Sequence, residues 1–299
     1  MANKIAFINS KGGCGKTTSI FHVAGVLTKM NKKILVIDFD KQKNTTSTLM
    51  MNVDKKNLPA KTVYDFLRGN ADPGEATGKA LFRSRGNATP KYYGADCMVS
   101  DVRFQDETDL KKIDGGKAGE ALDRFIGQQG YDWVLVDMPP SNATLNHICF
   151  SYIVNYVVIP FTCDMFSLDG YDDIIRTIKD SQETNPDLHS VGVYLARYMA
   201  NCALDKYIKL QLSQRFNDKN FNKNNFIDVQ IPLAADIREA VFYGRPISYL
   251  KESSNSCKAY ENLVREIIGR IESIKKSCED FERSKNGEKI RRIAYHEKI

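Results

Sequence analysis

The stretch Ile5–Ser19 reads IAFINSKGGCGKTTS and decides the fold of this 299-residue chain. A short apolar run leads into a glycine-rich loop and then into a helical pattern over Thr17–Met30, which is the context of a phosphate-binding P-loop. Glycines let successive backbone N–H groups converge on phosphate oxygens, and the helix N-terminus adds positive potential. The sequence therefore predicts a nucleotide-binding site here, with these loop contributors: Gly12, Gly13, Cys14, Gly15, Lys16, Thr17 and Thr18.

Two lysines and a threonine supply the polar side chains of this loop. Lys16 is placed to reach the β- and γ-phosphates, and the hydroxyl of Thr17 is placed to coordinate Mg²⁺. The common pattern G-x-x-x-x-G-K-[ST] is only partly matched, because Ser10 replaces its first glycine. A second lysine, Lys11, stands directly before Gly12. Because Lys16 already supplies the phosphate-binding lysine of the loop, we expect Lys11 to have a different role.

Short runs rich in Val and Ile alternate with helical patterns along the rest of the chain. This alternation predicts an α/β fold, a doubly wound and mostly parallel sheet with helices on both faces, whose ligands bind beyond the carboxyl ends of the strands. The predicted strands are Ile5–Asn9, Ile34–Asp38, Trp133–Asp137, Val157–Phe161 and Val191–Leu195, with weaker candidates at Cys97–Val99 and Ile227–Ile231. The predicted helices are Thr17–Met30, Gly119–Gln129, Asp172–Glu183, Ala203–Phe216 and Tyr260–Ile274.

The length of the chain allows either two domains or one large α/β domain. The continuous alternation favours one domain over residues 1–275, followed by a charged C-terminal extension at 276–299. Residues 69–95 are rich in Gly, Ala and basic side chains without clear periodicity, and we expect them to form a surface excursion.

The composition excludes several classes of protein. With 42% hydrophobic and 27% charged residues, the chain resembles average soluble globular proteins. No apolar run approaches the ~20 residues that span a bilayer, and the N-terminus lacks a signal-peptide core. Seven widely spaced cysteines without a C-x-x-C pair indicate neither a disulfide framework nor a zinc site. We expect a cytosolic protein whose net charge of +6 permits an anionic partner.

Aspartates follow two of the predicted strands. Asp38 and Asp40 lie in ILVIDFDKQKNTT, and Asp137 lies in WVLVDMPPS. A single aspartate in such a place is most simply a turn or a helix cap. Three of them, where parallel strands deliver their ends to a phosphate loop, favour carboxylates that hold a metal ion and place the attacking water.

The string K-G-G-x-G-K-T-T is the deviant Walker A motif, and with it the sequence resembles the ParA/MinD family of P-loop ATPases, closest to ParA-type, Soj-like proteins. The aspartate segments resemble the family strings DxDPQ and VDxPP, with Lys41 at the usual proline. The resemblance implies an ATPase with ATP and Mg²⁺ as cofactors. By it, Asp40 orients the attacking water, Asp137 holds Mg²⁺ through water and Asp38 supports the metal shell.

The resemblance also implies an ATP-bound homodimer, in which each Lys11 reaches the phosphates of its partner and joins Lys16 and Asp40 in catalysis. The stretch IPLAADIREAVFYGRPI at Ile231–Ile247 resembles the family segment that lies against adenine. Pro232 and Leu233 are therefore candidate contacts of the base.

ParA-type ATPases bind DNA without sequence preference, and a basic stretch of this chain suits that partner. The region 197–225 carries six Lys or Arg residues, and the candidate DNA contacts are Arg197, Lys206, Lys209, Arg215 and Arg238, with Lys219 and Lys223 nearby. Neutralising phosphates gives a sequence-independent, salt-sensitive affinity. A solvated helix face explains the same pattern equally well.

These resemblances predict a cytoplasmic, nucleoid-associated partition ATPase that cycles between a DNA-bound ATP dimer and a released form, stimulated by an adaptor bound to a centromere-like site. The alternative is a MinD-like ATPase that positions material on membranes or at cell poles. The C-terminal string IRRIAYHEKI lacks the compact apolar face that membrane binding needs, so we do not expect a membrane partner.

Overall fold

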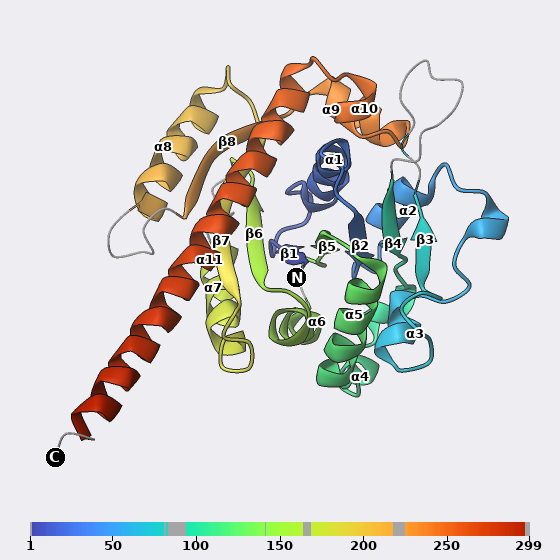
Figure 1. The fold of residues 1–299 in the computed structure, drawn as a ribbon. Coiled ribbons are helices and arrows are strands. Elements are labelled where there is room, and N and C mark those ends of the chain that lie inside the picture. The colour runs from blue at the N-terminus through green and yellow to red at the C-terminus, as the bar shows by residue number, and fades with distance from the viewer. Residues whose placement is uncertain are drawn as a thin grey trace.

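The computed structural model describes residues 2–80, 82, 94–140, 142–163, 169–217 and 225–296. Eight strands form one sheet in the order β3-β4-β2-β5-β1-β6-β7-β8 (Figure 1). All neighbours are parallel except β3, which pairs antiparallel with β4. The strands are β1 (Asn3–Phe7), β2 (Ile34–Asp38), β3 (Thr77–Lys79), β4 (Ala95–Met98), β5 (Trp133–Asp137), β6 (Tyr156–Phe161), β7 (His189–Tyr198) and β8 (Phe226–Pro232). The predicted doubly wound α/β fold is confirmed.

Helices cover both faces of this sheet. On one face lie α1 (Lys16–Lys29), α10 (Ile247–Leu250) and α11 (Asn255–His296), and on the other lie α5 (Gly115–Gln129), α6 (Ala143–Ile148) and α7 (Asp169–Ser181). The remaining helical segments are α2 (Asn44–Met50), η1 (Lys55–Asn57), α3 (Val63–Leu67), η2 (Val102–Gln105), α4 (Glu107–Leu110), the π-helical η3 (Cys149–Ile153), α8 (Ala203–Asn217) and α9 (Ala235–Phe242).

Strand periodicity divides the core into two layers. Ile5 and Phe7 of β1 pack with α1 and α11, whereas Ala6 points to the opposite layer with α5 and α7. Every residue of β2 and β5 is buried, as expected for central strands covered on both faces. Burial on both sides explains why these strands read as continuous apolar runs in the sequence.

The structure extends the sequence expectations in two places. Within residues 69–95, Thr77–Lys79 forms the edge strand β3, which is too short for an alternating pattern to reveal. The helix predicted over Tyr260–Ile274 is the 42-residue α11, which crosses position 275 without interruption. Among the side chains of α11 that the structure describes, Ile271 is the last buried one, and the helix then projects from the body (Figure 1).

Three further observations concern the expectations from composition. All seven cysteines are free. In the described parts of the chain, no helix is both long and apolar enough to cross a bilayer. The side chains of Ile290 and Ile293, in the C-terminal string considered above for membrane binding, lie outside the described part of the chain.

Candidate nucleotide site

The glycine-rich loop runs from the end of β1 to α1, which begins at Lys16. Gly13 has φ +75° and Gly15 has φ +88°, a left-handed backbone that side chains with a Cβ rarely adopt. Gly15 is the N-cap of α1 and lies close to Ala196, since a Cβ on it would stand 3.5 Å from that methyl group. The glycines thus permit the tight turn that leads the chain into the helix N-terminus.

Lys16 is buried inside this turn. Its Nζ donates to the carbonyl oxygens of Asn9 and Lys11, both at 3.2 Å. Asn9 anchors the start of the loop, because its amide donates to the Pro160 carbonyl at 2.7 Å and its side-chain oxygen accepts the Lys11 N–H at 2.9 Å. The ammonium group is therefore held within the loop by these two carbonyl oxygens.

Cys14, at the variable position of the loop, turns its side chain into the protein. It is 1% exposed, and burial raises the pKa of its thiol above the ordinary value. A buried thiol of raised pKa is a poor nucleophile, so Cys14 contributes its backbone to the loop.

Asp137 stands at the end of β5, directly behind the loop. Its Oδ2 accepts the hydroxyls of Thr17 and Thr45, each at 2.6 Å. Its Oδ1 is buried and has no hydrogen-bond partner among the described residues. Burial raises the pKa of this carboxyl, because the charged form loses its hydration. An orphaned carboxylate oxygen next to the Thr17 hydroxyl fits the donor set of Mg²⁺, which binds proteins through few side chains plus water and phosphate.

Asp38 lies beside Asp137, because β2 and β5 pair with these two residues in register. Its Oδ1 accepts the N–H of Asp40 at 3.0 Å, and its Oδ2 accepts the N–H and hydroxyl of Thr46 at 2.8 and 2.7 Å. Burial, together with the neighbouring Asp137, raises the pKa of Asp38. Two carboxyls of raised pKa in one buried place form a site that a cation would stabilise.

Asp40 opens the turn after β2. Its Oδ1 accepts the N–H of Gln42 at 2.9 Å, and its backbone carbonyl accepts the Ser100 hydroxyl at 2.7 Å. The N–H of Ser100 donates to Thr46 Oγ1, so the end of β4 is bonded to both aspartate turns. Asp38, Asp40 and the β4 end therefore form one connected polar unit.

A cavity of about 710 Å³ joins these parts. Of the predicted residues, those of the loop from Gly12 to Thr18 line its wall, together with Asp40, Arg197, Pro232, Leu233 and Arg238. Lys11 is not among the lining residues, and Asp38 and Asp137 lie buried behind the wall. Sequence reasoning missed several wall residues, which come from distant segments: Gln42, Asn44, Phe104, Gln105, Glu107, Asn142 and Tyr260. No motif marks these positions, because tertiary packing alone brings them to the cavity.

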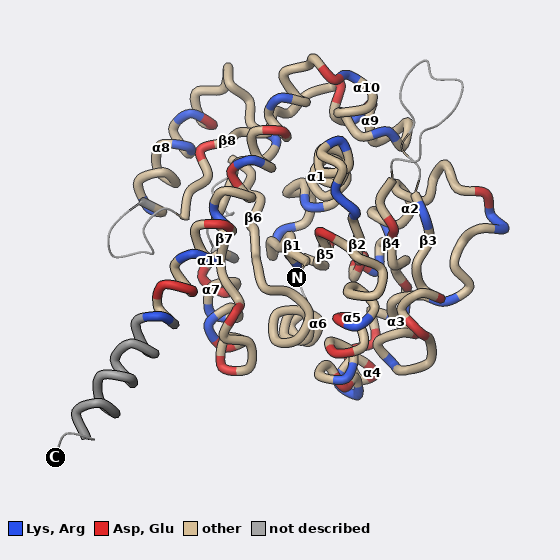
Figure 2. The backbone as a smooth tube through the Cα atoms, viewed as in Figure 1, with Lys and Arg blue, Asp and Glu red and all other residues tan. Residues whose placement is uncertain are grey.

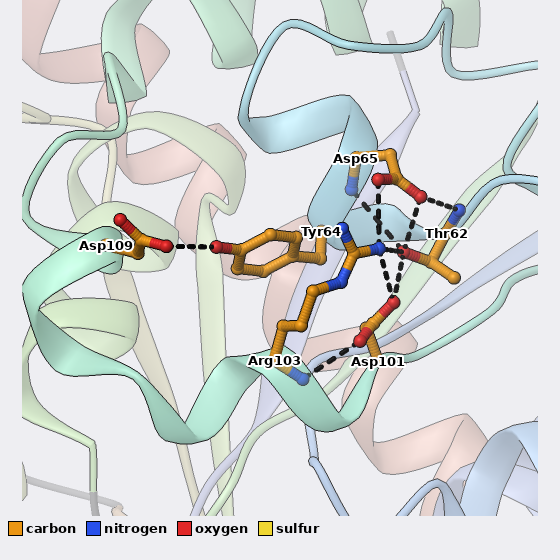
Figure 3. Close-up of polar contacts among 6 residues, drawn as sticks. All are labelled: Thr62, Tyr64, Asp65, Asp101, Arg103 and Asp109. Carbon is orange, nitrogen blue, oxygen red and sulfur yellow. Dashed lines mark hydrogen bonds and ion pairs between the residues drawn. The ribbon is translucent and has the colours of Figure 1, made fainter.

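The wall segment 102–107 is held by what we call the Arg103 clasp, formed by Thr62, Tyr64, Asp65, Asp101, Arg103 and Asp109 (Figure 3). The Arg103 guanidinium contacts carboxylate oxygens of Asp101 at 2.7 Å and Asp65 at 2.9 Å, and it lies 4.4 Å from the centre of the Tyr64 ring. Thr62 and Asp65 also form a capping box at the start of α3. The clasp therefore ties the loop after β4 to α3.

The pKa values of the clasp carboxyls Asp65 and Asp101 are lowered, whereas those of Asp38 and Asp137 behind the glycine-rich loop are raised. The hydrogen bond from Arg103 holds the pKa of Asp101 well below its usual range. Burial acts to raise the pKa of Asp65, but bonds from Thr62 and Arg103 outweigh it, and the net direction is downward. The positive charge that stabilises the ionised forms of Asp65 and Asp101 is the Arg103 guanidinium.

The candidate DNA contacts differ in their surroundings. Arg197 donates from Nη1 to the Gly13 carbonyl at 2.9 Å and lines the cavity. On α8, Lys206 is exposed, whereas Lys209 pairs with Asp228 at 2.9 Å and Arg215 with Asp172 at 3.5 Å. Basic and acidic positions are interspersed around α8 and β8 (Figure 2). Lys219 and Lys223 lie outside the described residues.

Residues 2–190 match the family described as AAA domain. A chromosome-partitioning ATPase Soj of Treponema pallidum is 32% identical over 283 residues, which cover 90% of this chain and 98% of that protein.

Two solved structures share the fold at lower sequence identity. Cobyrinic acid a,c-diamide synthase of Mycobacterium smegmatis, with bound ADP and magnesium, has a TM-score of 0.68 at 23% identity, covering 91% of this chain and 96% of that one. The septum site-determining protein MinD of Pyrococcus horikoshii, complexed with Mg-ADP, has a TM-score of 0.65 at 22% identity, covering 89% and 96%.

Proposed function

Because this chain belongs to the family of ParA- and Soj-type P-loop ATPases, we propose that it hydrolyses ATP with Mg²⁺ to drive the partition of DNA. The observation that carries this proposal is the hydrogen bond from the Thr17 hydroxyl to Asp137. Thr17 directly follows Lys16, whose ammonium group is enclosed by the loop. That arrangement joins a phosphate cradle to a cation site, which is the minimum that nucleoside triphosphate chemistry requires.

In this proposal the chain holds the nucleotide by its loop and its base segment. Lys16 binds the β- and γ-phosphates, and Pro232 and Leu233 pack on the adenine. Thr17, Asp137 and Asp38 hold Mg²⁺, which supplies positive charge against the phosphate oxygens. Asp40, on the cavity wall, orients the attacking water.

Lys11 has a second role in the proposal. Lys16 already fills the loop, so Lys11 reaches the nucleotide of a partner protomer and makes dimerisation depend on ATP. The ATP dimer then binds DNA through Lys206, Lys209, Arg215 and Arg238, and a centromere-bound adaptor stimulates hydrolysis and release. Lys209 and Arg215 already have carboxylate partners, which DNA phosphates would have to displace. Binding weakens as salt rises, because neutralising phosphates releases counterions.

The test measures molar mass and DNA binding of the full chain with Mg²⁺ and a non-hydrolysable ATP analogue. We expect the parent to dimerise and to bind random-sequence duplex DNA. Lys11→Ala should bind the analogue as a monomer and lose DNA, whereas Lys16→Ala should lose the analogue itself. Arg176→Ala, an exposed arginine on α7 paired with Asp173, is the matched control and should behave like the parent.

A salt series sharpens the DNA part of the test. Removing Lys206 and Lys209 together should make the slope of log affinity against log salt shallower by roughly 0.9 for each lost phosphate contact. A parent that stays monomeric with the analogue contradicts the dimer proposal. Binding to anionic liposomes in place of DNA supports the MinD-like alternative.

A further inference from the structure

Arg197 has an unusual backbone. Its φ is +57°, a left-handed conformation that costs free energy in any residue with a Cβ. It sits where β7 and β8 change register: Leu195 pairs with Gln230 but Tyr198 pairs with Pro232, so β7 carries one extra residue across this interval. Such a bulge re-aims a side chain, and bulges are concentrated beside active sites.

The bulge aims Arg197 at the phosphate loop. Its Nη1 donates to the Gly13 carbonyl at 2.9 Å, linking two segments 184 residues apart. The preceding residue, Ala196, lies against Gly15, so β7 meets the loop at two points. The side chain is exposed toward the cavity rather than packed in the core.

The planarity of the peptide bond gives this contact a consequence. In a trans peptide the carbonyl of Gly13 and the N–H of Cys14 belong to one rigid plane and point in opposite directions. Gly13 has the freedom to rotate this plane, because it lacks a Cβ and already sits at φ +75°. A donor that holds the carbonyl therefore also fixes the direction of the Cys14 N–H.

We propose that Arg197 is a positioning residue of the nucleotide site, which holds the Gly13 peptide so that the Cys14 N–H faces the bound phosphates. This rests on the nucleotide site proposed above and assigns Arg197 to the phosphate cradle instead of the DNA surface. The guanidinium acts through the peptide and needs no contact with the nucleoside.

The test compares ADP with adenosine, which lacks phosphates. Titration calorimetry on the full chain measures both ligands with the parent, Arg197→Ala, Arg197→Gly and Arg197→Lys. We expect ADP affinity to fall by about tenfold or more in the Ala and Gly variants, the usual range for a lost hydrogen bond to a charged group, and adenosine affinity to stay unchanged. Arg197→Lys keeps a donor and should lose less.

Stability provides an independent control. Glycine adopts φ +57° freely, so nucleotide-free Arg197→Gly should melt above Arg197→Ala and close to the parent while still binding ADP weakly. A purely structural role predicts the reverse, with lower melting and normal ADP affinity. Arg176→Ala controls for loss of one exposed arginine.

Several outcomes overturn the proposal. Equal ADP affinity in the parent and Arg197→Gly removes the positioning role, and equal losses for ADP and adenosine indicate contact with the nucleoside instead. Normal ADP affinity with loss of DNA binding returns Arg197 to the DNA surface. If the parent itself binds no ADP, the nucleotide site fails, and the Arg197 proposal fails with it.

Discussion

Two groups of carboxyls, both close to the cavity wall, have opposite electrostatic character. Asp38 and Asp137 are fully buried, have no basic side chain bonded to them among the described residues, and have raised pKa values. Asp65 and Asp101 share the Arg103 guanidinium and have lowered pKa values (Figure 3). The first pair is the one for which we propose a bound Mg²⁺ ion, and the second pair is neutralised by Arg103 within the fold.

The two pairs of carboxyls differ in their effect on the stability of the fold. Uncompensated buried carboxyls destabilise the nucleotide-free fold, and such strain is typical of binding sites. Satisfied carboxyls stabilise the loop that completes the cavity wall. Perturbed pKa values alone do not identify a site, because both groups have them; the direction of the shift separates the two roles.

The largest expected effect comes from Asp137→Asn. The amide can still accept bonds from Thr17 and Thr45 but no longer carries charge toward Mg²⁺, so ATP turnover should fall by about 100-fold. The nucleotide-free variant should melt at or above the parent temperature, because a desolvated charge is gone. Turnover assays and thermal denaturation in chelator measure both effects, and a clearly lower melting temperature would contradict the assignment.

Arg103→Ala should act in the opposite sense. It leaves Asp101 and Asp65 without their cation and should lower the free energy of unfolding by about 1–2 kcal/mol, a modest loss because the guanidinium is 46% exposed. Urea denaturation measures the change. Arg103→Lys keeps the positive charge but lacks the planar guanidinium group, so its free energy of unfolding should lie between those of the parent and Arg103→Ala. An unchanged free energy of unfolding in Arg103→Ala would show that the clasp does not stabilise the fold.

Acid should reveal the same clasp in the parent. Lowered pKa values in the folded state mean that the stabilisation is present above the unfolded value, about 3.9, and is lost as pH falls through the folded values. The free energy of unfolding should therefore fall more steeply below pH 4 in the parent than in Arg103→Ala. Parallel curves for the two proteins would remove Arg103 as the cause.

The smallest expected effect links the two regions. Ser100→Ala removes the hydroxyl that donates to the Asp40 carbonyl, at a cost of about 0.5–1.5 kcal/mol. If Asp40 orients the attacking water as proposed, turnover should fall several-fold with little change in KM, since the Asp40 turn loosens while the phosphate loop is untouched. Ser47→Ala, on the neighbouring helix α2, is the control. An unchanged rate would place the Asp40 turn under other restraints.

Local patterns carried most of the fold and the centre of the site. The runs at Ile34–Asp38 and Trp133–Asp137 matched β2 and β5 residue for residue, because central strands are apolar throughout. Lys16 and Thr17 were identifiable because the chemistry of a phosphate loop lies within one short segment. Asp137 could be found because a strand end has a fixed place in a parallel sheet.

What escaped the sequence depends on contacts between distant segments. Arg197 looked like one of several basic residues, and only the β7 bulge turns it toward Gly13. The Arg103 clasp unites two segments with no shared motif. Tyr260 reaches the cavity from α11 because that helix packs against α1. Such pairings are set by the assembled tertiary structure, which no local periodicity encodes.

The length of α11 has a mechanical consequence. Tyr260 touches the cavity near the beginning of the helix, and the helix ends at His296. At 1.5 Å per residue, the last turn lies about 54 Å from that contact. A tilt of about 5° at Tyr260 would swing a straight helix of this length by about 5 Å at its far end. A small movement of α11 at the cavity is therefore amplified into a large displacement at its C-terminal end. A spectroscopic label near that end would report such a movement.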